Sequence, residues 1–162
     1  MPTNRLSRAV NFINRLPQGL RPSLLSLLFA TQVRFAGTAR IRVDNLTRQQ
    51  ACLTLRNRRR VGNHVGGIHA AAMALLAESA TGFVVGMSVP DTHLLLIKTL
   101  HVDYRRRATG SLRALATLTP EQLIALTTQT RGEMAVQVAI TDDSGQQPIT
   151  CEMIWAWLPR QH

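Results

Sequence analysis

Hydrophobic and polar residues alternate through much of the chain after residue 37. Alternation with a period of two is typical of strands that bury one face. Six stretches show it and are predicted to be strands: 38–45, 50–56, 93–104, 111–118, 133–141 and 149–157. In the first stretch, Ala39, Ile41 and Val43 are predicted to face the core. The third contains a continuous apolar run, Leu94–Ile97, which predicts cover on both faces of that strand.

The segment from about Ile68 to Met87 has a helical composition and is apolar on every side, with Glu78 as its only acid. A helix without a polar face must be wrapped by other elements. Hairpin-length connections join antiparallel strands, so the sheet that wraps it is expected to be antiparallel. Two strands, one long helix and four strands together predict an α+β protein with the hotdog fold, in which a sheet of about six strands wraps a long central helix.

Further helices are predicted outside this core. Apolar residues at helical spacing predict two N-terminal helices, Leu6–Leu16 and Pro22–Phe35. A short helical insert is expected near 120–128, because Thr119 can cap it in a capping box completed by Gln122. The predicted organisation is an N-terminal helical extension, 1–37, followed by a hotdog domain, 38–162.

The composition fits one soluble domain, with 162 residues and 45% hydrophobic residues. The net charge is +10, and Lys98 is the only lysine. Arginine favours phosphate and carboxylate partners, but codon composition explains an arginine-rich chain equally well. Only 4% of residues are aromatic and they do not interleave with the basic runs, so nucleic acid is not the expected partner. Cys52 and Cys151 are expected to be free thiols in a reducing cytoplasm.

The N-terminal region, 1–43, holds seven arginines and no acid. This composition resembles a transit peptide, and contact with a membrane surface through Arg5, Arg8 and Arg15 is a further alternative. We favour helices that pack on the domain. No segment is expected to span a bilayer, because the apolar runs here are too short and the 68–87 segment carries a central acid.

The stretch GNHVGGIHAAAMALLAESATG, residues 62–82, joins a His/Asn loop to the predicted central helix. The spacing of Asn63, His69 and Glu78 resembles the hotdog-fold acyl-CoA thioesterases of the phenylacetic-acid-degradation type. In that family an Asn-containing loop leads to His-Gly at the helix start, and an acid follows nine residues after the His. Together with LLLIKTLHVDYRRRATG, the chain looks most like a bacterial subgroup of that superfamily over about residues 38–158.

The resemblance implies thioester hydrolysis. Glu78 would activate water or attack the carbonyl, and the Ala70 N–H would stabilise the oxyanion. His69 would polarise the carbonyl region, and Asn63 would orient water or substrate. Much of the family has Gly at the position of Ala70, so Gly66 and Gly67 are alternative points at which backbone approaches the ligand.

Helix geometry adds a prediction of its own. His69 and Glu78 are nine residues apart, which is two and a half turns, so their side chains leave a helix on opposite sides. If both serve one site, a second subunit must supply one of them. We therefore expect a homodimer or tetramer with shared sites, an arrangement that the family resemblance also implies.

Other candidates surround this motif. The clusters Arg58–Arg60 and Arg105–Arg107 are interpreted either as a clamp for coenzyme A phosphates or as solvated turns. His64 is a weaker candidate for substrate binding. No metal site is expected, because neither His64 and His69 with Glu78 nor His93 with His101 has a recognised zinc spacing.

The sequence thus predicts a cytoplasmic acyl-CoA thioesterase-like hydrolase. It is expected to act on an acyl-CoA or acyl-carrier thioester, with coenzyme A as part of the substrate and no separate cofactor. The alternative is a non-catalytic module of the same fold that binds acyl-CoA or lipid. A dehydratase or hydratase acting on acyl thioesters is a third option.

Overall fold

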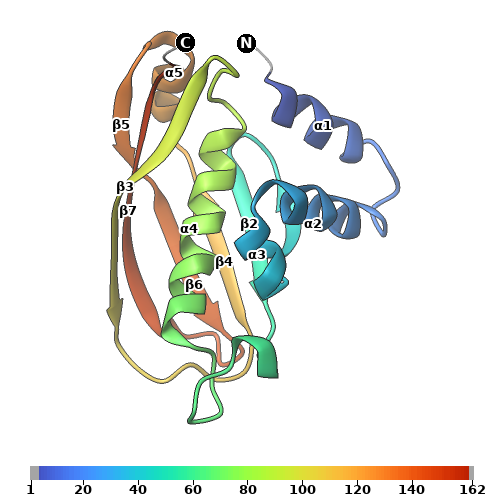
Figure 1. Cartoon of the computed structure of the whole chain (residues 1–162), viewed down its shortest axis with the longest axis vertical. Helices are drawn as coiled ribbons and strands as arrows, with labels where there is room; N and C mark the ends of the chain where they lie inside the picture. Colours follow the sequence, from blue (N-terminus) through green and yellow to red (C-terminus); the bar gives the residue numbers. More distant parts are fainter. Residues whose placement is uncertain (1–3, 161–162) are drawn as a thin grey trace.

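The computed structural model describes residues 4–160, which form a curved antiparallel sheet around one long helix (Figure 1). The helices are α1 (Arg5–Ile13), α2 (Arg21–Gln32), α3 (Arg34–Ala39), the 3-10 turn η1 (Arg59–Val61), α4 (Ala70–Gly86) and α5 (Pro120–Thr128). The strands are β1 (Arg42–Leu46), β2 (Gln50–Leu55), β3 (His93–Tyr104), β4 (Leu112–Thr117), β5 (Gly132–Ala135), β6 (Gln137–Asp142) and β7 (Ile149–Pro159).

The strands form two hydrogen-bonded groups, ordered β1-β2-β4-β6 and β3-β7-β5, and every pairing is antiparallel. All six predicted stretches contain strands, but the fifth divides into β5 and β6. Between them the Val136 N–H donates to the Met153 carbonyl. The chain passes there from one group to the other, because β5 pairs with β7 and β6 pairs with β4. This switch curves the sheet around α4, and the arrangement is the predicted hotdog fold.

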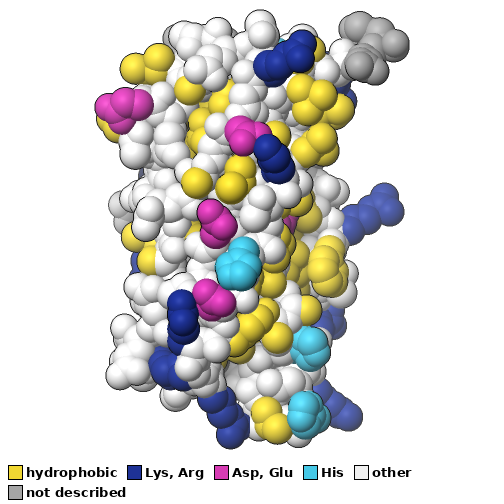
Figure 2. Space-filling model, turned by 90° about the vertical axis from the view of Figure 1, so that its left-hand side faces the viewer, with side chains coloured by type: hydrophobic (Ala, Val, Ile, Leu, Met, Phe, Trp, Pro, Cys, Tyr) yellow, Lys and Arg dark blue, Asp and Glu magenta, His cyan; other side chains and the backbone are white. Residues whose placement is uncertain are grey.

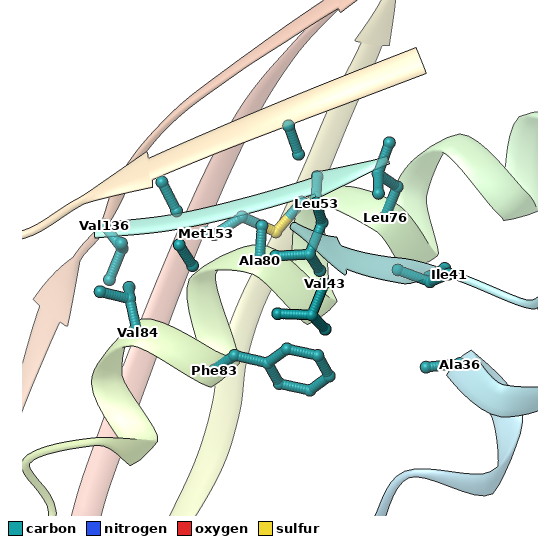
Figure 3. Packing of buried hydrophobic residues seen from close by; sticks show 14 of the residues in the cluster. Ala36, Ile41, Val43, Leu53, Leu76, Ala80, Phe83, Val84, Val136 and Met153 are labelled. Atoms are coloured by element: carbon teal, nitrogen blue, oxygen red, sulfur yellow. The ribbon is translucent and has the colours of Figure 1, made fainter. Parts of the chain in front are cut away.

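The core lies between α4 and the concave face of the sheet, where side chains such as Leu53, Leu76, Val84 and Met153 meet (Figure 3). All four are completely buried. Burying one such side chain contributes about 1.5–3 kcal/mol. Gly82 of α4 lies where a Cβ would come within 2.7 Å of the Trp155 ring, so the close approach of helix and strand requires a glycine. The observed packing confirms that the sheet wraps the helix.

The N-terminal helices pack on α4 and on β1, on the side away from β3 (Figure 1). The rings of Phe29 in α2 and Phe83 in α4 stack with centroids 3.8 Å apart. The second predicted helix is interrupted: α2 ends at Gln32, Val33 departs from helical geometry with φ −119° and ψ 87°, and α3 follows. Helical spacing alone cannot show a one-residue break between two helical segments.

The first strand begins later than predicted. Ala39 belongs to α3, and Arg40 ends that helix in the left-handed region, with φ 55°. Ala39, Ile41 and Val43 are nevertheless buried as predicted. The alternation of buried side chains therefore spans the end of α3 and the start of β1, so it did not mark where the strand begins.

The remaining elements agree with the sequence. α5 begins with the predicted capping box between Thr119 and Gln122. Cys52 and Cys151 are free thiols. No helix within residues 4–160 has both the length and the apolar character needed to cross a membrane.

One expectation fails within a single chain. Among residues 4–160, β3 pairs with β7 alone, so its other edge has no partner strand there. The predicted cover on both faces is absent, and Leu96, for example, is 49% exposed. Figure 2 shows hydrophobic side chains exposed on this side of the molecule, among acidic and basic ones.

Candidate functional site

The loop before α4 is organised by Asn63. Its side-chain oxygen accepts hydrogen bonds from the Val65 and Gly67 amides at 3.0 and 2.9 Å, and its amide group donates to the Ile68 carbonyl at 3.3 Å. Gly66 has φ +80°, a conformation that favours glycine. The side chain of Asn63 is therefore engaged in shaping the loop, which places it in a positioning role within one chain.

His69 is the N-cap of α4. Its Nδ1 accepts a hydrogen bond from the Ala71 N–H at 3.1 Å. In the neutral imidazole an accepting Nδ1 leaves the proton on Nε2, so the second ring nitrogen is a donor. The residue is exposed, and this donor is free to meet a ligand.

Ala70 is the first residue of α4, and its N–H has no acceptor among residues 4–160. Tyr104, at the end of β3, donates its hydroxyl to the Ala70 carbonyl at 2.8 Å and so ties β3 to the helix start. A free amide at the positive end of a seventeen-residue helix can bind an anion or a developing oxyanion. Ala70 is an exposed residue.

Glu78 lies two turns further along α4 and lines a cavity of about 850 Å³. Its carboxylate forms no ion pair with any described residue, and its only hydrogen bond is a long one, 3.5 Å, from the Ser79 hydroxyl. Burial raises the pKa of Glu78, and the Ser79 hydrogen bond only partly opposes it. A half-buried acid without a cation is costly for the fold, which favours a role in chemistry.

His69 lines a different cavity, of about 210 Å³, between α3, η1 and the first turns of α4. Glu78 is absent from the lining of that cavity, and His69 is absent from the lining of the larger one. Within one chain the two residues therefore line different cavities.

The arginine clusters lie near the N-terminal end of α4 but differ in their contacts. Arg106 donates to the fully buried carboxylate of Asp142 at 2.8 Å, and Arg105 pairs with Asp103 at 3.2 Å on the surface. Arg107 donates to the Val65 carbonyl, joining its loop to the loop of Asn63. These contacts give Arg106 a structural role and Arg107 a role in holding the loop.

The Arg58–Arg60 cluster is more available to a ligand than the Arg105–Arg107 cluster. Arg60 donates to the Thr38 carbonyl at 3.3 Å, whereas the side chains of Arg58 and Arg59 are exposed and unpaired among the described residues. His64 and Val65 are exposed at the loop tip, and Gly67 is buried beneath it. Within residues 4–160 no three side chains of the His, Cys, Asp and Glu types gather as metal ligands.

Sequence reasoning missed two features of this region. Tyr104 contacts the start of α4, a relation that only the sheet's curvature creates. The N-terminal helices supply part of the Glu78 cavity, with Leu6, Ala9 and Leu28 in its lining. Their helical spacing predicted an apolar face but could not show which surface that face covers.

The comparisons agree with this architecture. A family model described as Domain of unknown function (DUF4442) matches residues 21–158, and the chain belongs to that family. A search of curated proteins found no match.

Solved structures with the hotdog fold resemble the chain over most of its length. One is a Pseudomonas aeruginosa protein described as of unknown function and a probable thioesterase, with a TM-score of 0.75, 22% identity, and coverage of 90% of this chain and 97% of that one. A Haemophilus influenzae thioesterase has a TM-score of 0.68 and 13% identity, covering 85% and 90% of the two chains. A thioesterase family protein from Silicibacter pomeroyi has a TM-score of 0.64 and 15% identity, covering 83% and 96%. At these identities the likeness shows the fold.

Proposed function

We propose that this protein hydrolyses acyl thioesters, with acyl-CoA as the substrate that its charge favours. The observation that carries the proposal is Glu78, a half-buried carboxylate with a raised pKa and no cation, at the wall of a largely apolar cavity. A base tuned towards neutral pH beside an apolar pocket suits attack on an acyl group.

The proposed chemistry uses water as the nucleophile. The Glu78 carboxylate takes a proton from water as the oxygen attacks the thioester carbon. The carbonyl oxygen becomes an oxyanion, which the Ala70 N–H and the Nε2–H of His69 stabilise. The C–S bond then breaks, and the thiolate takes up the proton that Glu78 holds. Removing one oxyanion donor typically costs about 3–4 kcal/mol in the transition state.

This assignment requires two copies of the chain, because His69 and Glu78 line separate cavities in one copy. We propose that a partner's β3 pairs with the unpaired edge of β3, so that the sheet continues from one copy into the other. The unpaired edge of a twelve-residue strand otherwise promotes aggregation. A two-fold axis at this seam makes two equivalent sites, each with His69 from one copy and Glu78 from the other.

Two kinds of support come from the fold relatives. Several bear thioesterase names, including those from Haemophilus influenzae and Silicibacter pomeroyi. A Staphylococcus aureus thioesterase has been solved with a glutamine replaced by alanine and, separately, with a glutamate fifteen residues further on replaced by alanine. Asn63 and Glu78 are separated by the same fifteen residues here.

The alternative function is a module that binds acyl-CoA or lipid without turnover. It is favoured by the engagement of the Asn63 side chain within its own loop, which leaves that group unavailable to orient water.

One experiment separates the two functions. Purified protein is offered acyl-CoAs from acetyl to hexadecanoyl, released thiol is detected, and Glu78→Gln is run beside it. Hydrolysis by the wild type that the variant lacks supports the thioesterase. Tight binding of acyl-CoA by both proteins without thiol release supports the binding module, and an active Glu78→Gln contradicts the role of Glu78.

A further inference from the structure

The cavity that Glu78 lines is built by two parts of the fold that are distant in sequence. Glu78, Gly82 and Gly86 line it from α4, while Leu6 and Ala9 of α1, together with Leu28 and Phe29 of α2, line it from the N-terminal helices. Leu95 of β3 and Trp155 of β7 complete its apolar walls. Helices α1 and α2 thus supply one side of the cavity in which Glu78 lies.

Specific polar contacts hold α1, which forms part of the wall that the N-terminal helices give to this cavity. The Asn4 side-chain amide donates to the carbonyls of Gly86 and Val89 at 2.7 and 2.6 Å, and Asp91 accepts from the Arg5 N–H. At the other end of α1, Asn14 donates to the Leu46 carbonyl at 2.9 Å. These hydrogen bonds hold α1 at both ends, so this wall has a defined position.

The shape of the cavity follows α4. It extends from Glu78 to Gly86, a span of eight residues and about 12 Å. An extended chain advances about 1.2 Å per bond, so this length matches roughly ten bonds. Arg5, Asp91 and Arg160 also line the cavity, with Arg5 and Asp91 close to Gly86, and charged groups there are unfavourable neighbours for a longer apolar chain.

We propose that α1 and α2 form the wall of an acyl-chain pocket and set the length of chain that the protein accepts, with medium-length chains preferred. The acyl group lies along α4, with its thioester at Glu78 and its methyl end near Gly86. The inference rests on the proposed function for the nature of the ligand, but it concerns binding and does not require turnover.

Substitutions at Ala9 and Leu28 can change the volume of the pocket in opposite directions. Ala9→Leu adds side-chain volume from α1, and Leu28→Ala removes it from α2. Each has a matched control on the same helix that does not line the cavity: Asn11→Leu on α1 and Leu27→Ala on α2, both at exposed positions.

The test measures binding by titration calorimetry with S-alkyl coenzyme A thioethers, which cannot be hydrolysed. Butyl, octyl, dodecyl and hexadecyl chains are compared. We expect octyl or dodecyl to bind most tightly to the wild type. Ala9→Leu is expected to weaken dodecyl binding at least about tenfold and butyl binding less than about twofold, since several methylenes lose their place. Leu28→Ala shifts the preference towards longer chains, and both controls follow the wild type.

The outcomes separate this inference from the proposed function. If Ala9→Leu and Leu28→Ala keep the wild-type dependence on chain length, or if the wild type binds all chain lengths equally, the pocket assignment is overturned. If the chain-length dependence shifts as expected while no acyl-CoA is hydrolysed, the pocket assignment stands and the thioesterase proposal falls.

Discussion

His69 caps α4 through its Nδ1 and lines a cavity of about 210 Å³, whereas Glu78, on the same helix, lines another of about 850 Å³. The two candidate groups are thus separated within one chain. A site that uses both must combine two copies, and this relationship is the basis of the proposed mechanism.

Replacement of Glu78 by Gln is expected to lower hydrolysis by at least about a hundredfold, the usual contribution of a general base.

The Glu78→Gln variant also tests whether the pKa of Glu78 is raised in the folded protein. Because the folded-state pKa of Glu78 lies above the unfolded value of 4.5, burial of the ionised form destabilises the fold once the pH rises through this range. The stability of Glu78→Gln relative to wild type should therefore grow as pH rises above 4.5.

Thermal unfolding at a series of pH values measures this difference. A constant difference between the two proteins from pH 3 to pH 8 would show that Glu78 is not perturbed in the folded state.

His69 is expected to combine a structural and a chemical role, and two replacements separate them. His69→Ala loses the cap and should cost about 1 kcal/mol of stability, whereas His69→Asn keeps a capping side chain and should cost much less. Both remove the Nε2–H, so both should lose hydrolysis. Denaturant unfolding gives the stabilities. An active His69→Asn protein would mean that His69 serves only as a cap.

Replacing Arg106 and replacing its neighbour Arg105 are expected to change the stability of the fold by different amounts. Arg106→Ala leaves the buried Asp142 carboxylate without its cation and should destabilise the fold by about 3 kcal/mol. Arg105→Ala removes a surface pair with Asp103 and should change stability by less than about 0.5 kcal/mol. Urea unfolding of both variants measures the contrast, and equal effects would contradict the structural role of Arg106.

Hydrogen bonds hold the pKa of Asp142 well below its usual range, against the opposing effect of burial. Because the folded-state pKa is depressed, this contribution is present above the unfolded value of 3.8 and is lost as the pH falls below it. The destabilisation caused by Arg106→Ala should accordingly shrink in acid.

The phosphates of coenzyme A are expected to bind Arg58 and Arg59, whose exposed side chains have no partner among residues 4–160. Replacing both by Gln should raise KM for acyl-CoA several-fold with little change in kcat. KM for a short thioester without the nucleotide should stay constant. Arg8→Gln, at an exposed position of α1, is the control for loss of charge. Equal rises in KM for both substrates would exclude a phosphate clamp at these residues.

Much of this structure could be predicted from the sequence, because its main elements are specified locally. The continuous apolar composition of α4, the alternation in the strands and the capping box at Thr119 each predict an element within a few positions. The division at Val136 could not be predicted, because it depends on which neighbour each half of the strand meets.

The candidate site divides in the same way. Helix geometry was enough to predict that the side chains of His69 and Glu78 leave α4 on opposite sides. The individual roles of Arg106 and Arg107 could not be predicted, because each depends on a carboxylate or carbonyl distant in sequence. The contribution of α1 and α2 to the Glu78 cavity is likewise a property of tertiary packing.

The central claim is the shared site, and subunit complementation tests it most directly. His69→Asn and Glu78→Gln proteins, each inactive alone, are mixed in equal amounts under conditions that allow exchange, which native mass spectrometry verifies. Each heterodimer then has one site with both changes and one with neither, so activity should return to about a quarter of the wild-type level. A verified exchange in which the mixture stays inactive would contradict a site built from two chains.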